Sequence, residues 1–221
     1  MITDDADRKI ARFNEAGLHY NLVADQIYVK RFTQGTDPFS VEYLRYVIAG
    51  LISFDMERMM GSGSKYDFNN GFAYRLNTKL QRIRHMLEPL MNFNLTEINL
   101  QQHSRSITEI YNILSLNGNG GLNENQNNHF YVGATKILHF LNPHLFIIVD
   151  SNASRAFRMS HAVHFRNTTQ PGYSAMLYEK CMEYARKDIV EYGVERFQAL
   201  EPDTPITRIY DKLTFATGAG L

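Results

Sequence analysis

Apolar residues recur at three- and four-residue steps along most of the chain, and this spacing is the strongest constraint on its fold. One example is the run formed by Val41, Leu44, Val47, Ile48, Leu51 and Ile52. Such spacing places apolar side chains on one face of an α-helix, whereas a half-buried strand needs alternation. The single strand-like run, Leu145–Val149, is too short and isolated to build a sheet. The sequence therefore predicts an all-α, compact multi-helix globular domain with little or no β-sheet.

Capping residues, prolines and glycines set the expected helix boundaries. Asp37-Pro38 predicts a helix start, and that helix is expected to run to Met59 or Met60. Ser106 is expected to begin another helix, with Glu109 at the reciprocal capping position. Further helices are expected over residues 72–91, from 94, over 132–141, 151–159 and 173–192, and in two shorter pieces near 193–200 and 205–215.

The chain is long enough to fold as one helical domain. It has 221 residues, of which 44% are hydrophobic, and these supply a sizeable core. We expect a single domain over residues 1–221. The alternative is two helical lobes with a seam near 117–130, where NGNGGLNENQNN is the clearest loop, or at the break Gly61–Lys65. The Asn-rich loop is either a lid or binding loop or a long connection.

Charge and cysteine content narrow the classes of function. Lys and Arg total 23 and so do Asp and Glu, which counts against a non-specific DNA binder but not against a specific one. Cys181 is the single cysteine, so no intrachain disulfide, cysteine-based zinc site or iron–sulfur cluster is expected, and a reducing cytoplasm fits. No apolar run approaches the roughly 20 residues of a membrane helix. We therefore expect no membrane, metal or cofactor, and the sequence leaves the oligomeric state open.

Residues 131–158, YVGATKILHFLNPHLFIIVDSNASRAFR, carry the clearest chemical signal. A helix that begins near Gly133 is followed by a stop at Pro143 and by an apolar run that ends in Asp150. An acid at the end of an apolar run is expected to be partly buried, with either a hydrogen-bond partner or a raised pKa. Asp150 is therefore the first candidate for a catalytic residue.

This stretch resembles the core of the helix-hairpin-helix DNA glycosylases, the superfamily of endonuclease III and adenine glycosylase. Val132-Gly133 is similar to the glycine turn that opens a helix in that family, and Val149-Asp150-Ser151-Asn152 is similar to its aspartate motif. The resemblance is limited to residues 131–158. It implies a glycosylase-like fold that recognises DNA or a modified base. It also implies that Asp150 stabilises the cationic sugar formed when an N-glycosidic bond breaks, with Asn152 helping to orient it.

The resemblance assigns roles to neighbouring residues as well. The family's lysine nucleophile follows the glycine by two positions, where this chain has Thr135, and Lys136 comes one residue later. This difference favours a monofunctional reaction that needs no lysine, although Lys136 is kept as a candidate catalytic residue. Gly133 and Thr135 are expected to approach a nucleic-acid phosphate, and Arg155 to contact it from the following helix.

Other candidates surround this stretch or lie on a second helix. Arg75, Lys79 and Arg82 share one helical face, which is either a solvated basic stripe or a contact for a phosphate backbone. His139 and His144 either line a pocket with Asp150 or are buried structural histidines. His161 and His164 have a spacing that can hold a metal, but no third ligand is identifiable.

The function itself has three interpretations. The first is a protein that recognises DNA or a modified base and resembles a monofunctional N-glycosylase. The second is a non-catalytic helical module that binds protein or nucleic acid in a phage or mobile-element setting, in which Asp150-Ser151-Asn152 serves as a helix N-cap. The third is an enzyme acting on a free nucleotide or another small molecule, which suits the neutral charge.

Overall fold

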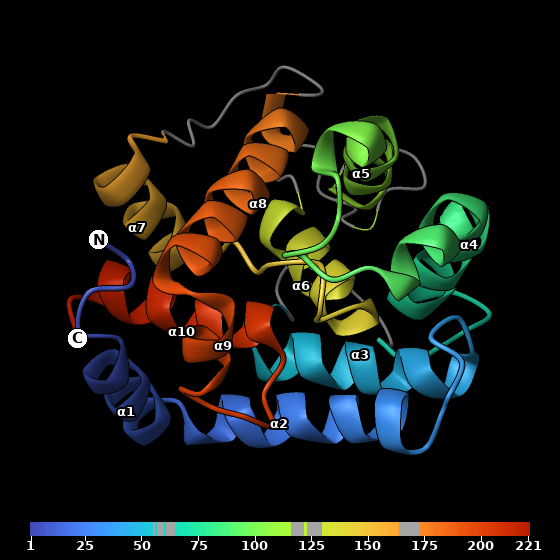
Figure 1. The fold of residues 1–221 in the computed structure, drawn as a ribbon. Helices are drawn as coiled ribbons and strands as arrows, with labels where there is room; N and C mark the ends of the chain where they lie inside the picture. The colour runs from blue at the N-terminus through green and yellow to red at the C-terminus, as the bar shows by residue number, and fades with distance from the viewer. Residues whose placement is uncertain (55, 57–59, 61–64, 116–121, 123–129, 164–172) are drawn as a thin grey trace.

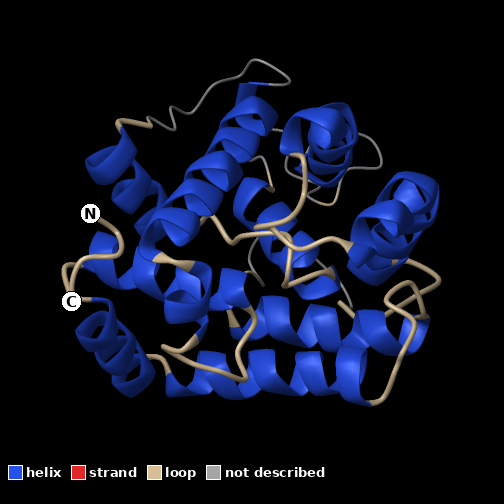
Figure 2. Cartoon of the chain, in the orientation of Figure 1, coloured by secondary structure: helices blue, strands red, loops and turns tan. Residues whose placement is uncertain are grey.

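The computed structural model describes residues 1–54, 56, 60, 65–115, 122, 130–163 and 173–221. These described residues form ten α-helices and no strand (Figure 2), which confirms the all-α prediction. Most of the Asn-rich loop, most of the break at 61–65 and His164 fall outside the described residues, so the interpretations given for them stay predictions. Within the described part of the chain, no helix is both long and apolar enough to cross a membrane.

The helices differ in length, from α9 with five residues to α8 with twenty. In chain order they are α1 (Ala6–Ala16), α2 (Leu18–Tyr28), α3 (Val41–Ser53), α4 (Gly71–Leu87), α5 (Leu100–Ser115), α6 (Tyr131–Leu141), α7 (Ser151–His161), α8 (Tyr173–Tyr192), α9 (Val194–Gln198) and α10 (Ile206–Ala219). A π-helical turn (Val29–Thr33) extends α2, and a 3₁₀ turn (Glu88–Asn92) extends α4.

Helix α3 begins later and ends earlier than the sequence predicted. The N-cap is Ser40, whose hydroxyl accepts from the Tyr43 amide at 3.1 Å, while Asp37 caps the preceding turn. At the other end α3 stops at Ser53 instead of reaching Met59, because Phe54 leaves the helical region with ψ of 28°. The sequence signal at Asp37-Pro38 was therefore a turn signal three residues ahead of the helix.

The helix predicted to begin at Ser106 begins at Leu100. Leu100 and Ile107 are both buried and lie two turns apart on one face of α5, and the half-buried His103 and Ser104 lie between them on that face. The polar residues 101–106 hid this face of the helix, and the capping pattern at Ser106 and Glu109 lies inside the helix.

Helix α6 lies at the centre of the molecule, with α2 and α3 along one side and α5 along another (Figure 1). Every residue of α6 from Gly133 to Leu141 is buried. On the side where both chain termini lie, α10 packs against α1 and α7. These contacts bring residues from near both ends of the sequence next to residues 131–158.

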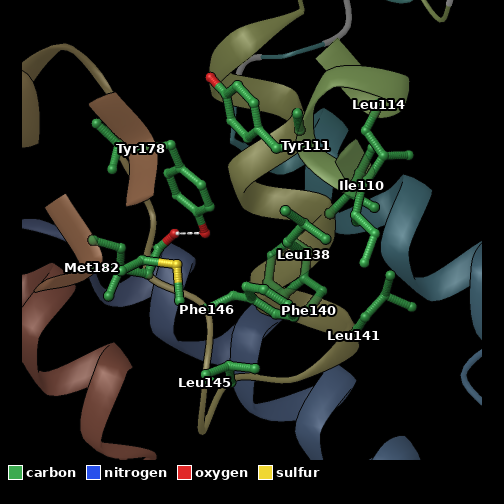
Figure 3. Packing of buried hydrophobic residues seen from close by; sticks show 14 of the residues in the cluster. Ile110, Tyr111, Leu114, Leu138, Phe140, Leu141, Leu145, Phe146, Tyr178 and Met182 are labelled. Atoms are coloured by element: carbon green, nitrogen blue, oxygen red, sulfur yellow. Dashed lines mark hydrogen bonds between the residues drawn. The ribbon is translucent and has the colours of Figure 1, made fainter. Parts of the chain in front are cut away.

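The segment 145–149 crosses this core as buried irregular chain that belongs to no helix or strand. The Asn142 carbonyl accepts from the amides of Leu145 and Phe146, and side chains bond to other peptide groups of the segment, as buried polar backbone requires. The Tyr178 hydroxyl donates to the Ile147 carbonyl at 3.0 Å (Figure 3), and the Thr135 hydroxyl accepts from the Val149 amide at 3.1 Å. Figure 3 also shows Leu145 and Phe146 beside apolar side chains of α6, the helix that contributes Leu138, Phe140 and Leu141.

A glycine lets α7 begin close against α10. A Cβ added to Gly218 would lie 1.9 Å from the carbonyl oxygen of Asn152. The side chain of Arg155 reinforces the same contact, because its Nη1 donates to the Gly218 carbonyl at 2.7 Å. The position of the α7 N-terminus therefore depends on this absence of a side chain.

We predict that Gly218→Ala destabilises the protein by about 1–3 kcal/mol, because backbone on one of two packed helices must move. Urea denaturation followed by circular dichroism measures the change. Gly220→Asn is the matched control, since Gly220 has a φ of 76° with no atom near its would-be Cβ, a conformation that Asn tolerates. Equal stability of Gly218→Ala and the parent protein would contradict the packing argument.

Candidate active site

A cleft of about 400 Å³ opens between the N-terminus of α7 and helices α1, α6 and α10. Its walls are largely aromatic and are formed by Phe13, Tyr20, Phe54, Phe130, Tyr131 and Phe215. Its charged residues are two acids, Asp150 and Asp211, and two bases, Lys136 and Arg208. The cleft thus combines flat apolar surfaces with a small cluster of charges.

Asp150 enters the cleft at the start of α7. It is half-buried and has extended backbone, and its Oδ1 accepts from the Ala153 amide at 2.8 Å. Asp150 is therefore an N-cap, as one interpretation of the sequence had it. It also lines the cleft, so capping and a role in chemistry are compatible. The hydrogen bond from the Val149 amide to the Thr135 hydroxyl fixes the backbone directly before Asp150.

Asp211 and Arg208 reach the cleft from α10. Both are almost fully buried and form an ion pair between the Asp211 carboxylate and Nη1 of Arg208. Burial is the largest influence on the pKa of Asp211 and raises it, and the negative charge of Asp150 raises it as well, whereas Arg208 and Lys136 lower it. Together these effects place the pKa of Asp211 at about 6, above its usual value. Asp211 can therefore gain and lose a proton near neutral pH.

Aromatic rings hold the guanidinium of Arg208. Its centre lies 5.2 Å from the centroid of the Phe13 ring and 5.9 Å from that of Phe54, distances typical of cation–π contacts. Nη2 donates to the Asn21 side chain at 3.0 Å, whereas Nε is buried without a hydrogen-bond partner. Arg208 is thus oriented by α1, α2 and its own helix.

Lys136 lies at the buried side of the cleft. Its ammonium donates to the Phe54 carbonyl at 3.1 Å and stands 4.8 Å from the centroid of the same residue's ring. Lys136 and Arg208 therefore share Phe54, and both bring positive charge to the cleft that Asp150 and Asp211 line.

Of the residues that the sequence assigned to catalysis, nucleic-acid binding or a pocket, three line the cleft, and these are Asp150, Asn152 and Lys136. Those that do not line it are Gly133, Thr135, Arg155, His139, His144, Arg75, Lys79 and Arg82. Gly133 is packed under the Phe130 ring, which its missing Cβ would meet at 2.1 Å. Thr135 and Arg155 make the structural hydrogen bonds described above.

The basic face of α4 lies across the molecule from α1, α7 and α10 (Figure 1). Arg75 donates to the Met60 carbonyl at 3.2 Å and Lys79 to the Ile113 carbonyl at 2.6 Å, while Arg82 is exposed. Two of these three cations thus bind the protein's own backbone, and the stripe does not border the cleft.

His139 is a buried structural histidine. Its Nδ1 is 2.7 Å from the Phe146 carbonyl, which can only accept, so Nδ1 carries the proton and Nε2 accepts from the Tyr28 hydroxyl at 2.6 Å. Burial lowers the pKa of His139 to about 3. His144 lies in a separate hollow beside Phe32, and burial lowers its pKa as well.

The sequence reasoning missed Arg208, Asp211 and the aromatic wall. A signal for the first two exists, because an Arg and an Asp three residues apart share a helical face inside the apolar segment 206–216. Within the described ranges, no group of three or more His, Cys, Asp or Glu side chains could hold a metal ion. Comparison with protein-family models, with curated proteins and with solved structures found no significant match.

We predict that Asp150→Ala lowers the free energy of unfolding by about 1 kcal/mol, because the α7 N-cap is lost. Asp150→Asn is the matched control, since its side-chain oxygen can still accept from Ala153, and it should stay within a few tenths of a kcal/mol of the parent. Chemical denaturation of the three proteins measures the difference. Equal losses in both variants would show that charge, not capping, sets the stabilising effect.

We predict that the parent protein loses stability on acidification partly through His139. Its folded pKa of about 3 lies below the unfolded value of 6.5, so its contribution is present above pH 6.5 and is lost as the pH falls toward 3, by up to about 1.4 kcal/mol per pH unit. Asp211, with its raised pKa, acts in the opposite direction below pH 6. Denaturation at several pH values should therefore show a steeper acid loss in the parent than in His139→Gln, whose amide can make both hydrogen bonds. Parallel pH curves would contradict the assignment.

Proposed function

We propose that the cleft binds a nucleobase and that Asp150 promotes hydrolysis of the bond between that base and its sugar. The observation that carries the proposal is a half-buried carboxylate at a helix start on the wall of an aromatic cleft. Breaking an N-glycosidic bond develops positive charge on the sugar, and a fixed carboxylate stabilises that charge. The N-terminus of α7 adds backbone amides that keep this carboxylate in place.

The aromatic side chains support a flat ligand. Purine and pyrimidine rings stack on aromatic faces, and enzymes that act on a base hold it in such a pocket. A volume of about 400 Å³ is within the range of small-molecule sites. The resemblance of residues 131–158 to helix-hairpin-helix glycosylases supports the same assignment, since it selects the same aspartate.

A free nucleoside or nucleotide is a second candidate substrate, beside a base within DNA. The observation in its favour is the placement of the basic residues, because Arg75 and Lys79 bind backbone carbonyls and Arg155 binds the Gly218 carbonyl. The formal charge of the whole chain is also zero. A protein that relies on phosphate contacts normally presents a basic surface.

We predict that the protein releases free base from at least one member of two panels, namely ribo- and deoxyribonucleosides, and oligonucleotides that carry uracil, hypoxanthine, 8-oxoguanine or 7-methylguanine. Chromatography of the released base measures the rate. Asp150→Asn should lower the rate by about 10²–10³-fold, the usual cost of removing a charge-stabilising group.

Asp203→Asn is the control, because Asp203 is exposed and outside the cleft. Activity on oligonucleotides that falls steeply with salt identifies a nucleic-acid substrate, whereas salt-independent activity on nucleosides identifies the second candidate. The proposal would be wrong if no base were released from either panel, or if Asp150→Asn were as active as the parent.

A further inference from the structure

We infer that Asp211 is a second catalytic residue, the acid that gives a proton to the departing base while Asp150 serves the sugar. This inference rests on the proposed function and adds a role that residues 131–158 do not contain. Its starting point is geometric, because Asp211 comes from α10 and Asp150 from the start of α7, and both line one cleft. Most enzymes that hydrolyse glycosidic bonds use two carboxyl groups in one cleft.

The two carboxyl groups occupy different environments. Asp150 is half-buried at a helix N-terminus, where backbone amides favour negative charge. Asp211 is almost fully buried in the middle of α10, where no free helix amides are present. Burial raises the pKa of Asp211, so Asp211 is the carboxyl group of the cleft that can carry a proton to a ligand.

The titratable and charged groups that act on Asp211 come from four elements, because the buried Tyr28 hydroxyl of α2 interacts with it in addition to groups of α6, α7 and α10. Arg208 on α10 and Lys136 on α6 favour its carboxylate, Asp150 at the start of α7 favours its protonated form, and α1 contributes only the uncharged ring of Phe13 to this part of the cleft. Burial outweighs the two cations, so the pKa of Asp211 is raised to about 6. Arg208 and Lys136 in turn stabilise the carboxylate that Asp211 becomes after it has given up its proton.

The reaction balances with water as the only co-reactant. The oxygen of water forms a bond to the sugar carbon, and the bond from that carbon to the base nitrogen breaks. Its electron pair stays on the base, which takes the proton of Asp211, while the proton of the attacking water passes to Asp150. Exchange with solvent then returns a proton to Asp211 and removes one from Asp150. No atom is oxidised or reduced.

A purely structural role for Asp211, as the counter-ion of Arg208, makes a different prediction. A counter-ion affects every substrate alike, because its loss disturbs the whole cleft. An acid matters only when the leaving base needs a proton. Guanine leaves with an added proton, whereas 7-methylguanine is already cationic in the nucleoside and leaves neutral without one. This pair of bases therefore separates the two roles.

The experiment compares hydrolysis of guanosine with that of 7-methylguanosine, and of the same two bases in oligonucleotides, by the parent, Asp211→Asn and Asp150→Asn. We expect Asp211→Asn to slow guanine release by about 10²-fold or more, the usual contribution of a general acid, and to slow 7-methylguanine release only severalfold. Asp150→Asn should slow both releases alike. In Asp211→Asn the new amide oxygen can still accept from Arg208, and melting temperatures report whether the fold is kept.

The parent protein alone supplies a second measurement, which needs no variant. Guanine release should decline as the pH rises above about 6, because Asp211 then loses its proton, and 7-methylguanine release should lack this decline. Equal losses on both bases in Asp211→Asn, or identical pH profiles for the two bases, would overturn the role of Asp211 and leave that of Asp150 intact. A parent protein that releases neither base from any of these probes overturns the inference together with the proposed function.

Discussion

The buried segment 145–149 is the constraint on which the arrangement of the cleft depends. Five apolar residues cross the core outside any helix, and within the described residues no sheet exists to pair with their peptide groups. The Asn142 carbonyl accepts from the first two amides, and three further peptide groups bond to Thr135 and His139 of α6 and to Tyr178 of α8. Each such bond replaces water that a buried amide or carbonyl has lost, so the segment has little freedom to shift. Asp150 is the next residue in the chain, so these hydrogen bonds also determine its position.

The charges of the cleft form a second constraint that explains the aromatic wall. Two cations and two carboxyl groups near one another would be costly to bury if left unpaired. Arg208 is paired with Asp211 and packed against Phe13 and Phe54, and Lys136 uses both the carbonyl and the ring of Phe54. The rings that we propose to stack on a flat ligand thus also hold the cations of the cleft.

The sequence predicted what depends on local pattern. Apolar spacing was enough for the helical class and for the bounds of α8, and an apolar run followed by an acid was enough to select Asp150. Local pattern failed where two signals competed, as at Ser106, whose capping motif lies inside α5, a helix that begins at Leu100. The spacing of Arg208 and Asp211 could have indicated a buried ion pair, but not a place in the cleft, because Asp150 lies about sixty residues earlier in the chain. Only the packing of α10 on α7 makes the two acids neighbours of one cleft.

The packing of α10 on α7 depends on Gly218 and Arg155, two residues that do not line the cleft. Gly218 lets the carbonyl of Asn152 approach α10, and Arg155 fixes the same contact from α7. Residues that the sequence suggested as phosphate contacts thereby have structural roles, because Arg155 joins α7 to α10 and Thr135 holds Val149, the residue before Asp150. A change at either residue should act on Asp150 and Asp211 together, through geometry and not through charge. The sequence stretch 131–158 and the C-terminal helix are therefore better understood as one unit that builds the cleft than as a motif and its support.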